Sequence, residues 1–88
     1  MKIKGVLWDN WNIEHMARHG VSQSEAEELV NHPQLKRRTR NGCYAIYGQT
    51  DFGRYLVVIV APRAEGMVYV VTARDMVERE KRWTKKRK

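Results

Sequence analysis

The stretch YLVVIVA, residues 55–61, decides the fold of this chain. It is apolar on both of its alternating sides, and a strand with no polar side belongs in the middle of a sheet that is covered on both faces. Two more runs rich in strand-forming residues flank it, at residues 43–48 and 67–73. The connections between the runs, residues 50–53 and 63–66, both end in glycine, as short hairpin loops commonly do. The three runs therefore predict an antiparallel meander, with helices on one face and other structure on the opposite face.

Ahead of the meander, the sequence predicts a short strand and a first helix. Alternation over residues 3–8 is typical of a strand. Asp9, or one of the asparagines that follow it, can cap a helix near residues 11–19, because a side-chain oxygen there accepts a hydrogen bond from an unpaired N–H group. Gly20 is placed to end that helix.

Two further helices complete the predicted fold. Ser22 and Glu25 form a capping box that begins a helix, and Pro33 ends it. From Arg74 the pattern becomes helical and charged and continues to the basic residues 85–88, which we expect to be frayed. The predicted fold class is α+β, with two short N-terminal helices, an antiparallel β meander and a C-terminal helix.

Length and composition narrow the class of protein. A chain of 88 residues encloses one small core, so we expect a single domain over residues 1–88. No apolar run approaches the roughly 20 residues that would cross a bilayer, and the start has no secretory segment, so we expect a cytoplasmic protein with no membrane partner. The only cysteine, Cys43, has no partner within the chain and is expected to be a buried free thiol.

The net charge of +7 is distributed unevenly along the chain. Residues 1–32 have a net charge of −2, and the remainder has a net charge of +9. Such asymmetry suits a polyanionic partner, because Lys and Arg that neutralise phosphates release condensed counterions. A solvated basic surface explains the charge equally well, and the charge alone does not separate the two.

Two motifs carry a resemblance to a known family. The stretch WDNWNIEHMARHGVS, residues 8–22, resembles the opening of BrnT-family toxins, and the glutamates at 25, 27 and 28 suit that family's second helix. The stretch VVTAR, residues 70–74, followed by Glu-Arg-Glu at 78–80, resembles the family's last strand and C-terminal helix. Here Arg18 stands where many members have Lys, and Trp83 stands where Tyr is common.

The resemblance implies a RelE-like fold and a function. It implies a type II toxin that cleaves RNA without a metal or other cofactor and blocks translation. It also implies neutralisation by a cognate ribbon-helix-helix antitoxin, with promoter DNA bound only through the toxin–antitoxin complex.

Arg74 is the first candidate for catalysis. Cleavage without a metal makes the 2′-hydroxyl attack the phosphate, and a guanidinium matches the geometry of the phosphoryl oxygens. Arg74 lies where a strand gives way to a helix, and Arg54 and Arg63 lie at the two ends of the central run. The alternative for Arg74 is an ion pair with Glu78, one helical turn later. If Arg74 stabilises the transition state, Arg74→Ala should lower the cleavage rate by orders of magnitude, with RNA affinity and thermal stability nearly unchanged.

His19 is the candidate for proton transfer, because imidazole titrates near neutrality. The alternative is that it caps the end of the first helix. His15 and His19 have metal-ligand spacing, but the sequence offers no third ligand. Glu78 and Glu80 are weaker candidates that could take or share a proton, with solvated ion pairs as their alternative role. Asp9 either caps the first helix or orients His19.

Candidate RNA contacts come from the basic residues and from the aromatic residue among them. They are Arg18, Arg37, Arg38, Arg40, Arg63, Lys81 and Trp83. The tyrosines at 44, 47, 55 and 69 either stack on bases or belong to the core. The rival function is a non-catalytic module that binds nucleic acid or another protein through the same surface.

Overall fold

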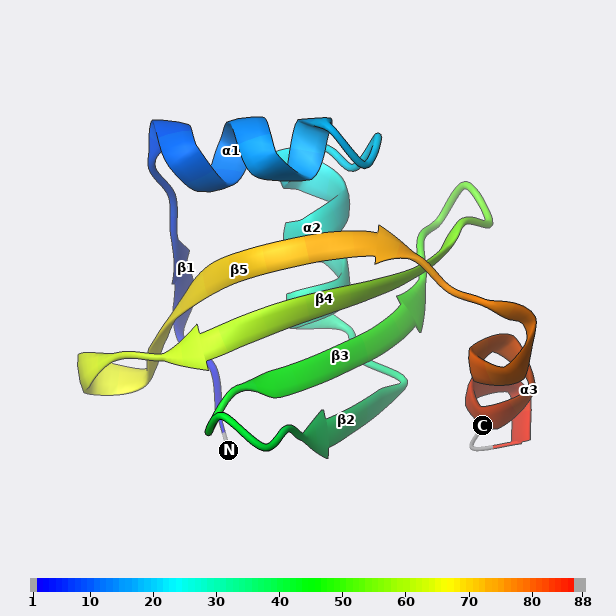
Figure 1. Cartoon of the computed structure of the whole chain (residues 1–88). Helices are drawn as coiled ribbons and strands as arrows, with labels where there is room; N and C mark the ends of the chain where they lie inside the picture. Colours follow the sequence, from blue (N-terminus) through cyan, green and yellow to red (C-terminus); the bar gives the residue numbers. More distant parts are fainter. Residues whose placement is uncertain (1, 87–88) are drawn as a thin grey trace.

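The computed structural model describes residues 2–86, with side chains described up to residue 85. In chain order, the described elements are β1 (Gly5–Leu7), α1 (Asn10–Ala17), α2 (Gln23–Asn31), β2 (Leu35–Arg38), β3 (Tyr44–Gln49), β4 (Tyr55–Pro62), a 3₁₀ turn (Ala64–Gly66), β5 (Met67–Asp75) and α3 (Glu78–Lys86). The strands form one sheet in the order β1-β5-β4-β3-β2 (Figure 1). The predicted α+β class is confirmed, and the described elements include two short helices before β2 and the antiparallel run β3-β4-β5.

The central position of β4 follows from its sequence. It pairs antiparallel with β3 on one side and with β5 on the other. Leu56, Val58 and Val60 are fully buried on one face. Val57 is fully buried on the other face, where Tyr55 and Ile59 are partly buried. Each face of β4 therefore meets a separate apolar cluster, as the two-sided apolar pattern predicts.

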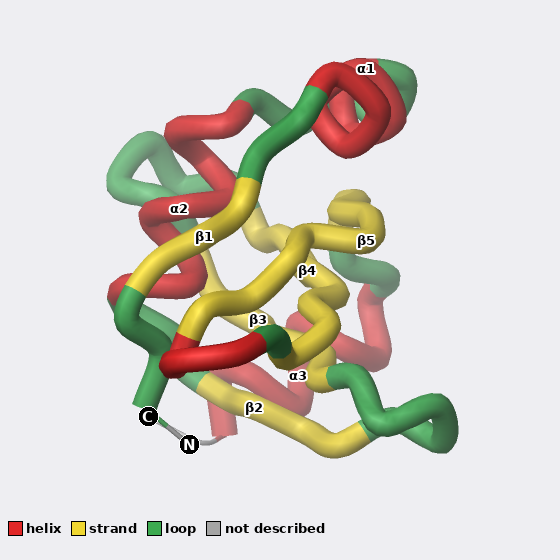
Figure 2. The backbone as a smooth tube through the Cα atoms, turned by 90° about the vertical axis from the view of Figure 1, so that its left-hand side faces the viewer, coloured by secondary structure: helices red, strands yellow, loops and turns green. Residues whose placement is uncertain are grey.

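The first face, which we call the α2 face, carries the larger cluster. Met16 of α1 and Leu29 of α2 are buried against the alternate residues of β4. In Figure 2, α2 lies on one side of the sheet and α1 lies above β5. Truncating a fully buried leucine such as Leu29 to alanine typically costs about 2–5 kcal/mol, so this cluster supplies much of the stability.

The second face, which we call the α3 face, is covered only in part. Trp83 of α3 packs against a small cluster of Ala45, Tyr47, Val57 and Met76. Figure 1 looks towards the α3 face: α2 is seen behind the sheet, and α3 lies beside one end of it.

The predicted caps of α1 and α2 are present. Asp9 accepts a hydrogen bond from the Asn12 N–H, and the Asn12 side chain accepts one from the Asp9 N–H, each at 2.9 Å. Asn12 is fully buried and also donates to the Leu7 carbonyl, so its amide fastens α1 to β1. Ser22 and Glu25 form the second capping box. Gly20, with φ +72°, follows α1 in the left-handed conformation that a side chain would disfavour.

Some elements differ from the sequence predictions. β2 was not predicted, because three of its four residues are cations, and it pairs antiparallel with β3. β1 pairs parallel with β5. β5 continues to Asp75, so Arg74 lies inside a strand and not at a helix start. Cys43 is half-buried and free, not fully buried. Of the expected basic tail, residues 85 and 86 belong to α3, and residues 87–88 lie outside the described residues.

Candidate nucleic-acid interface

The α3 face has an uncovered area beyond the reach of α3, which we call the open face. It consists of side chains of β4 and β5 that are only partly buried: Ile59, Ala61, Tyr69, Thr72 and Arg74. The register places them together, because Ile59 pairs with Thr72 and Ala61 pairs with Tyr69, while Arg74 pairs with the buried Val57. A sheet surface with apolar and hydroxyl side chains and an arginine at one end is a platform on which an extended ligand can lie.

Arg74 is held in a fixed orientation on this face. Its two terminal nitrogens donate to the two carboxylate oxygens of Glu80 at 2.8 and 2.9 Å. The Glu80 side chain is only 7% exposed, whereas that of Arg74 is 44% exposed. Glu80 also accepts a hydrogen bond from the Val77 N–H at the start of α3. The pair therefore presents one ordered guanidinium to solvent and keeps its carboxylate covered.

The two pKa shifts agree with this pairing. The hydrogen bond from Arg74 holds the pKa of Glu80 below its ordinary value, and burial opposes that shift. The hydrogen bond to Glu80 raises the pKa of Arg74. Both groups are therefore charged at neutral pH.

The alternative role of Arg74, an ion pair with Glu78, is wrong, because Arg74 pairs with Glu80 instead. The chain stays extended to Asp75 and α3 begins only at Glu78, so a spacing of four residues is not one helical turn here. Glu78 is exposed in the first turn of α3 and pairs with Lys81 at 3.4 Å.

Cations gather on the aromatic residues around α3. The guanidinium carbons of Arg37 and Arg79 lie 4.8 and 5.4 Å from the centre of the Trp83 ring, and Tyr47 meets the same ring edge-on. The ammonium groups of Lys81 and Lys85 lie near the Tyr55 ring. The two guanidinium groups cover the Trp83 ring, so a ligand at this position would meet positive charge before it could stack on the ring.

Arg63 lies at the far end of the open face. Its guanidinium rests 5.4 Å from the centre of the Tyr69 ring and donates to the Pro62 carbonyl. The Tyr69 hydroxyl donates to Asp9. The pKa of Tyr69 is raised, mainly by burial and to a smaller extent by this hydrogen bond. Arg63 comes six residues after Val57, the pairing partner of Arg74, and six steps of extended chain span about 20 Å at roughly 3.3 Å per residue.

Arg54 has a different environment from Arg74. It donates to the Gly20 carbonyl, to both carboxylate oxygens of Glu25 and to Asp75. The hydrogen bond to Asp75 is the largest cause that raises the pKa of Arg54. Its guanidinium joins the α1–α2 turn, α2 and the end of β5, so a phosphate contact would have to displace one of these partners.

His19 lies in the α1–α2 turn and is exposed. Its backbone N–H donates to the Met16 carbonyl, and its ring meets the His15 ring edge-on at 5.6 Å. Asp9 caps the opposite end of α1, so it does not orient His19. Within residues 2–86, no group of three His, Cys, Asp or Glu side chains is placed to hold a metal ion.

The structure thus divides the predicted site residues into groups. Five surround the start and outer side of α3: Arg37, Arg74, Glu78, Lys81 and Trp83. Arg63 lies at the other end of the open face. Arg18, His19 and Arg54 lie on the side of the molecule that carries α1 and α2. Arg38 is exposed on β2, and Arg40 is exposed in the turn that follows β2.

Sequence reasoning missed two contributors to this interface. Glu80 was considered only as a weak proton acceptor, and Arg79 was not considered. The position of Glu80 in α3 could have revealed its role. Glu80 is the third residue of that helix, where a glutamate commonly accepts a hydrogen bond from the N–H group of the capping residue. A correct helix start would have identified Glu80 as ordered and available to Arg74.

Comparisons with known proteins give no matching family model and no matching curated sequence. None of the helices described in the structure is both long and apolar enough to cross a bilayer.

Proposed function

We propose that the chain is a metal-independent endoribonuclease toxin whose open face and neighbouring cations bind single-stranded RNA. The observation that carries the proposal is Arg74, an ordered guanidinium on a sheet surface with 44% of its side chain exposed and its carboxylate partner covered. Cations flank that surface at both ends, from Arg37 and Arg79 near α3 to Arg63 beyond Tyr69. Such a row of cations suits a phosphate backbone that runs along the strands.

The proposed reaction needs three actions. The 2′-oxygen of RNA forms a bond to phosphorus, and the bond from phosphorus to the 5′-oxygen breaks, which leaves a 2′,3′-cyclic phosphate and a 5′-hydroxyl. Arg74 stabilises the negative charge that grows on the phosphoryl oxygens, because its orientation is set before the substrate arrives. A base takes the 2′-hydroxyl proton, and the leaving oxygen acquires a proton.

Glu78 is the proton acceptor that we favour. It lies at the start of α3, four residues after Arg74. Its side chain is 76% exposed and, among the described residues, pairs only with Lys81, at 3.4 Å, so a bound nucleotide can reach it. His19 is the chemically better base at neutral pH, but it lies in the α1–α2 turn, away from the side chains that pack around α3. The leaving oxygen takes its proton from water in this scheme.

The proposed setting is the bacterial cytoplasm, in complex with a ribbon-helix-helix antitoxin. This part of the proposal rests on the resemblance of residues 8–22 and 70–80 to BrnT-family toxins. Promoter DNA would be bound by the antitoxin within the complex.

A binding module without catalysis is the second candidate. The observation that favours it is the pairing of Arg74 with Glu80, which leaves less of the guanidinium charge for the transition state, while Arg37, Arg63 and Arg79 still offer charge for binding. In this function the open face holds RNA and no bond is broken.

The experiment that separates the two uses an end-labelled single-stranded RNA incubated with the purified protein in EDTA. The ribonuclease proposal expects cleavage with cyclic phosphate ends, and it expects no cleavage at a position where the RNA carries a 2′-deoxy nucleotide. Binding without cleavage of the all-ribose strand would support the binding module. Cleavage that stops when EDTA is added would contradict the metal-independent mechanism.

A further inference from the structure

The strand β2 forms one edge of the sheet. It pairs with β3 on its inner side, and within residues 2–86 no strand pairs with its outer side. The backbone at a sheet edge can pair with a strand of another chain. β2 is therefore a place where an extended segment can be added to the sheet.

The charge of β2 selects which segment can be added. Three of its four residues are the consecutive cations Lys36, Arg37 and Arg38. A second copy of this strand would place like charges opposite one another, which destabilises strand pairing. An acidic strand would instead place carboxylates beside cations on both faces of the sheet.

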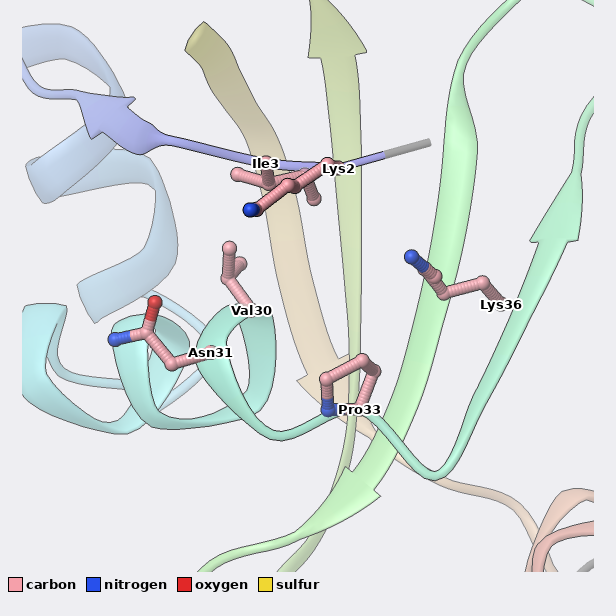
Figure 3. A pocket seen from close by; sticks show the side chains of 6 residues that line it. All are labelled: Lys2, Ile3, Val30, Asn31, Pro33 and Lys36. Atoms are coloured by element: carbon pink, nitrogen blue, oxygen red, sulfur yellow. The ribbon is translucent and has the colours of Figure 1, made fainter. Parts of the chain in front are cut away.

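A pocket lies next to β2 on the α2 face (Figure 3). It has a volume of about 510 Å³, and Lys2 and Lys36 extend into it from different walls. Ile3, Val30 and Pro33 form its apolar lining, and Asn31 is the remaining lining residue. Ammonium groups above an apolar surface match the side chain of glutamate, which has an aliphatic stem and a terminal carboxylate.

We propose that β2 binds an extended acidic segment of a protein partner, which adds to the sheet as a sixth strand and places a glutamate in the neighbouring pocket. The site does not include the open face and does not depend on the proposed ribonuclease function, although Arg37 belongs both to β2 and to the cations that we place beside the RNA. Backbone hydrogen bonds supply affinity, and the three cations with the pocket supply the preference for acidic side chains.

The test uses a fluorescein-labelled peptide, acetyl-Val-Glu-Glu-Glu-Val-Glu-Val-amide, and measures fluorescence anisotropy. A second peptide has the same sequence with alternate backbone nitrogens methylated, which keeps its charge and removes its strand-pairing donors. We expect methylation to lower the affinity at least about tenfold, as strand addition requires. Equal binding of the two peptides would mean simple attraction of charges and would overturn the proposal.

Two variants locate the site, and a third is a matched control. Arg38→Glu and Lys2→Glu should each weaken peptide binding, by about tenfold or more for Arg38→Glu because it reverses a charge beside the added strand. Lys4→Glu makes the same change of charge just before β1, at the opposite edge of the sheet, and should change peptide affinity less than about twofold.

Binding of an oligouridylate tests whether β2 contacts RNA instead of a peptide. If Arg38→Glu weakens oligouridylate binding and leaves peptide binding unchanged, β2 is an RNA contact and the proposal is wrong. Circular dichroism and thermal melting check that each variant folds, and Arg38→Gln offers a milder change at the same position.

Discussion

Two arginines at the same end of the sheet hold carboxylates on opposite faces, and they differ in how many separate elements they connect. The Arg54 guanidinium donates to two carboxylates and a carbonyl, and so connects the α1–α2 turn, α2 and the end of β5. Arg74 binds one covered carboxylate and the adjacent Asp75 carbonyl, and its side chain is 44% exposed on the open face, against 35% for Arg54. The first arrangement is typical of a structural connection, and the second is typical of a group prepared for a ligand.

The acidic residues of the two sides show the same difference. On α2, Glu27 accepts a hydrogen bond from the Trp8 indole, and Glu28 accepts one from the Asp51 N–H, so these carboxylates connect α2 to its neighbours. Around α3, Glu80 holds Arg74, and the cations rest on the rings of Trp83 and Tyr55. The cations of Arg37 and Arg79 thus lie against an aromatic ring, whereas the carboxylates of α2 connect that helix to its neighbours.

The largest effect is expected from Arg74→Ala. If Arg74 stabilises the phosphoryl oxygens, the cleavage rate per folded molecule should fall by about 10²–10³, the usual cost of one such donor. The unfolding free energy should also fall by about 1–3 kcal/mol, because a nearly buried carboxylate loses its guanidinium partner. This replaces the sequence-based expectation that stability is unchanged. Initial cleavage rates and urea unfolding measure the two effects.

The double variant Arg74→Ala, Glu80→Gln separates the two roles. Removing the charge of the abandoned carboxylate should restore part of the stability and none of the cleavage. Recovery of cleavage in the double variant would show that Arg74 acts only by holding Glu80, and the contrast with Arg54 would fail.

Arg54→Met should have the opposite signature. We expect a loss of about 1–2 kcal/mol of unfolding free energy, since several partners are lost but the ion pairs are partly screened by solvent. Cleavage per folded molecule should stay close to that of the parent protein, measured under conditions where both are folded. A fall in cleavage as large as that of Arg74→Ala would move the phosphate-binding role to Arg54.

The fold was predictable where local chemistry and burial agree. The two-sided apolar run at residues 55–61, the capping box of Ser22 and the stop at Gly20 each describe one element without distant information. β2 was not predictable in this way, because its cations carry no apolar pattern and its strand conformation depends on pairing with β3.

The site was harder to predict, because its contacts depend on where elements end. Arg74 was singled out from the sequence, but its partner depends on β5 continuing to Asp75 and on α3 beginning only at Glu78. The Arg54 contacts join residues 21 to 34 positions apart, and such pairings leave no local pattern.

Acid should weaken the fold through Glu80. Its pKa is lower in the folded chain than the ordinary value of 4.5, so the unfolded chain binds the proton more readily. The stabilisation is complete above pH 4.5 and is lost as the pH falls through the lower, folded pKa. Urea unfolding between about pH 6 and about pH 3 should show a smaller decline for Glu80→Gln than for the parent protein. Identical declines would mean that the pair adds nothing to stability.

The smallest effect concerns the path of RNA over the surface, and it compares Arg37 with Arg18. Arg37 rests on Trp83 beside the open face, whereas Arg18 ends α1 on the other side. If RNA follows the α3 face, Arg37→Gln removes one phosphate contact. The slope of log affinity against log salt should then become shallower by about 0.7, the value for a single strand.

Arg18→Gln changes the net charge by the same amount and should leave the slope unaltered. Titrations of a labelled oligouridylate at several salt concentrations measure both slopes. An equal change for the two variants would mean that RNA also crosses α1, and that the division between a structural side and a binding side is wrong.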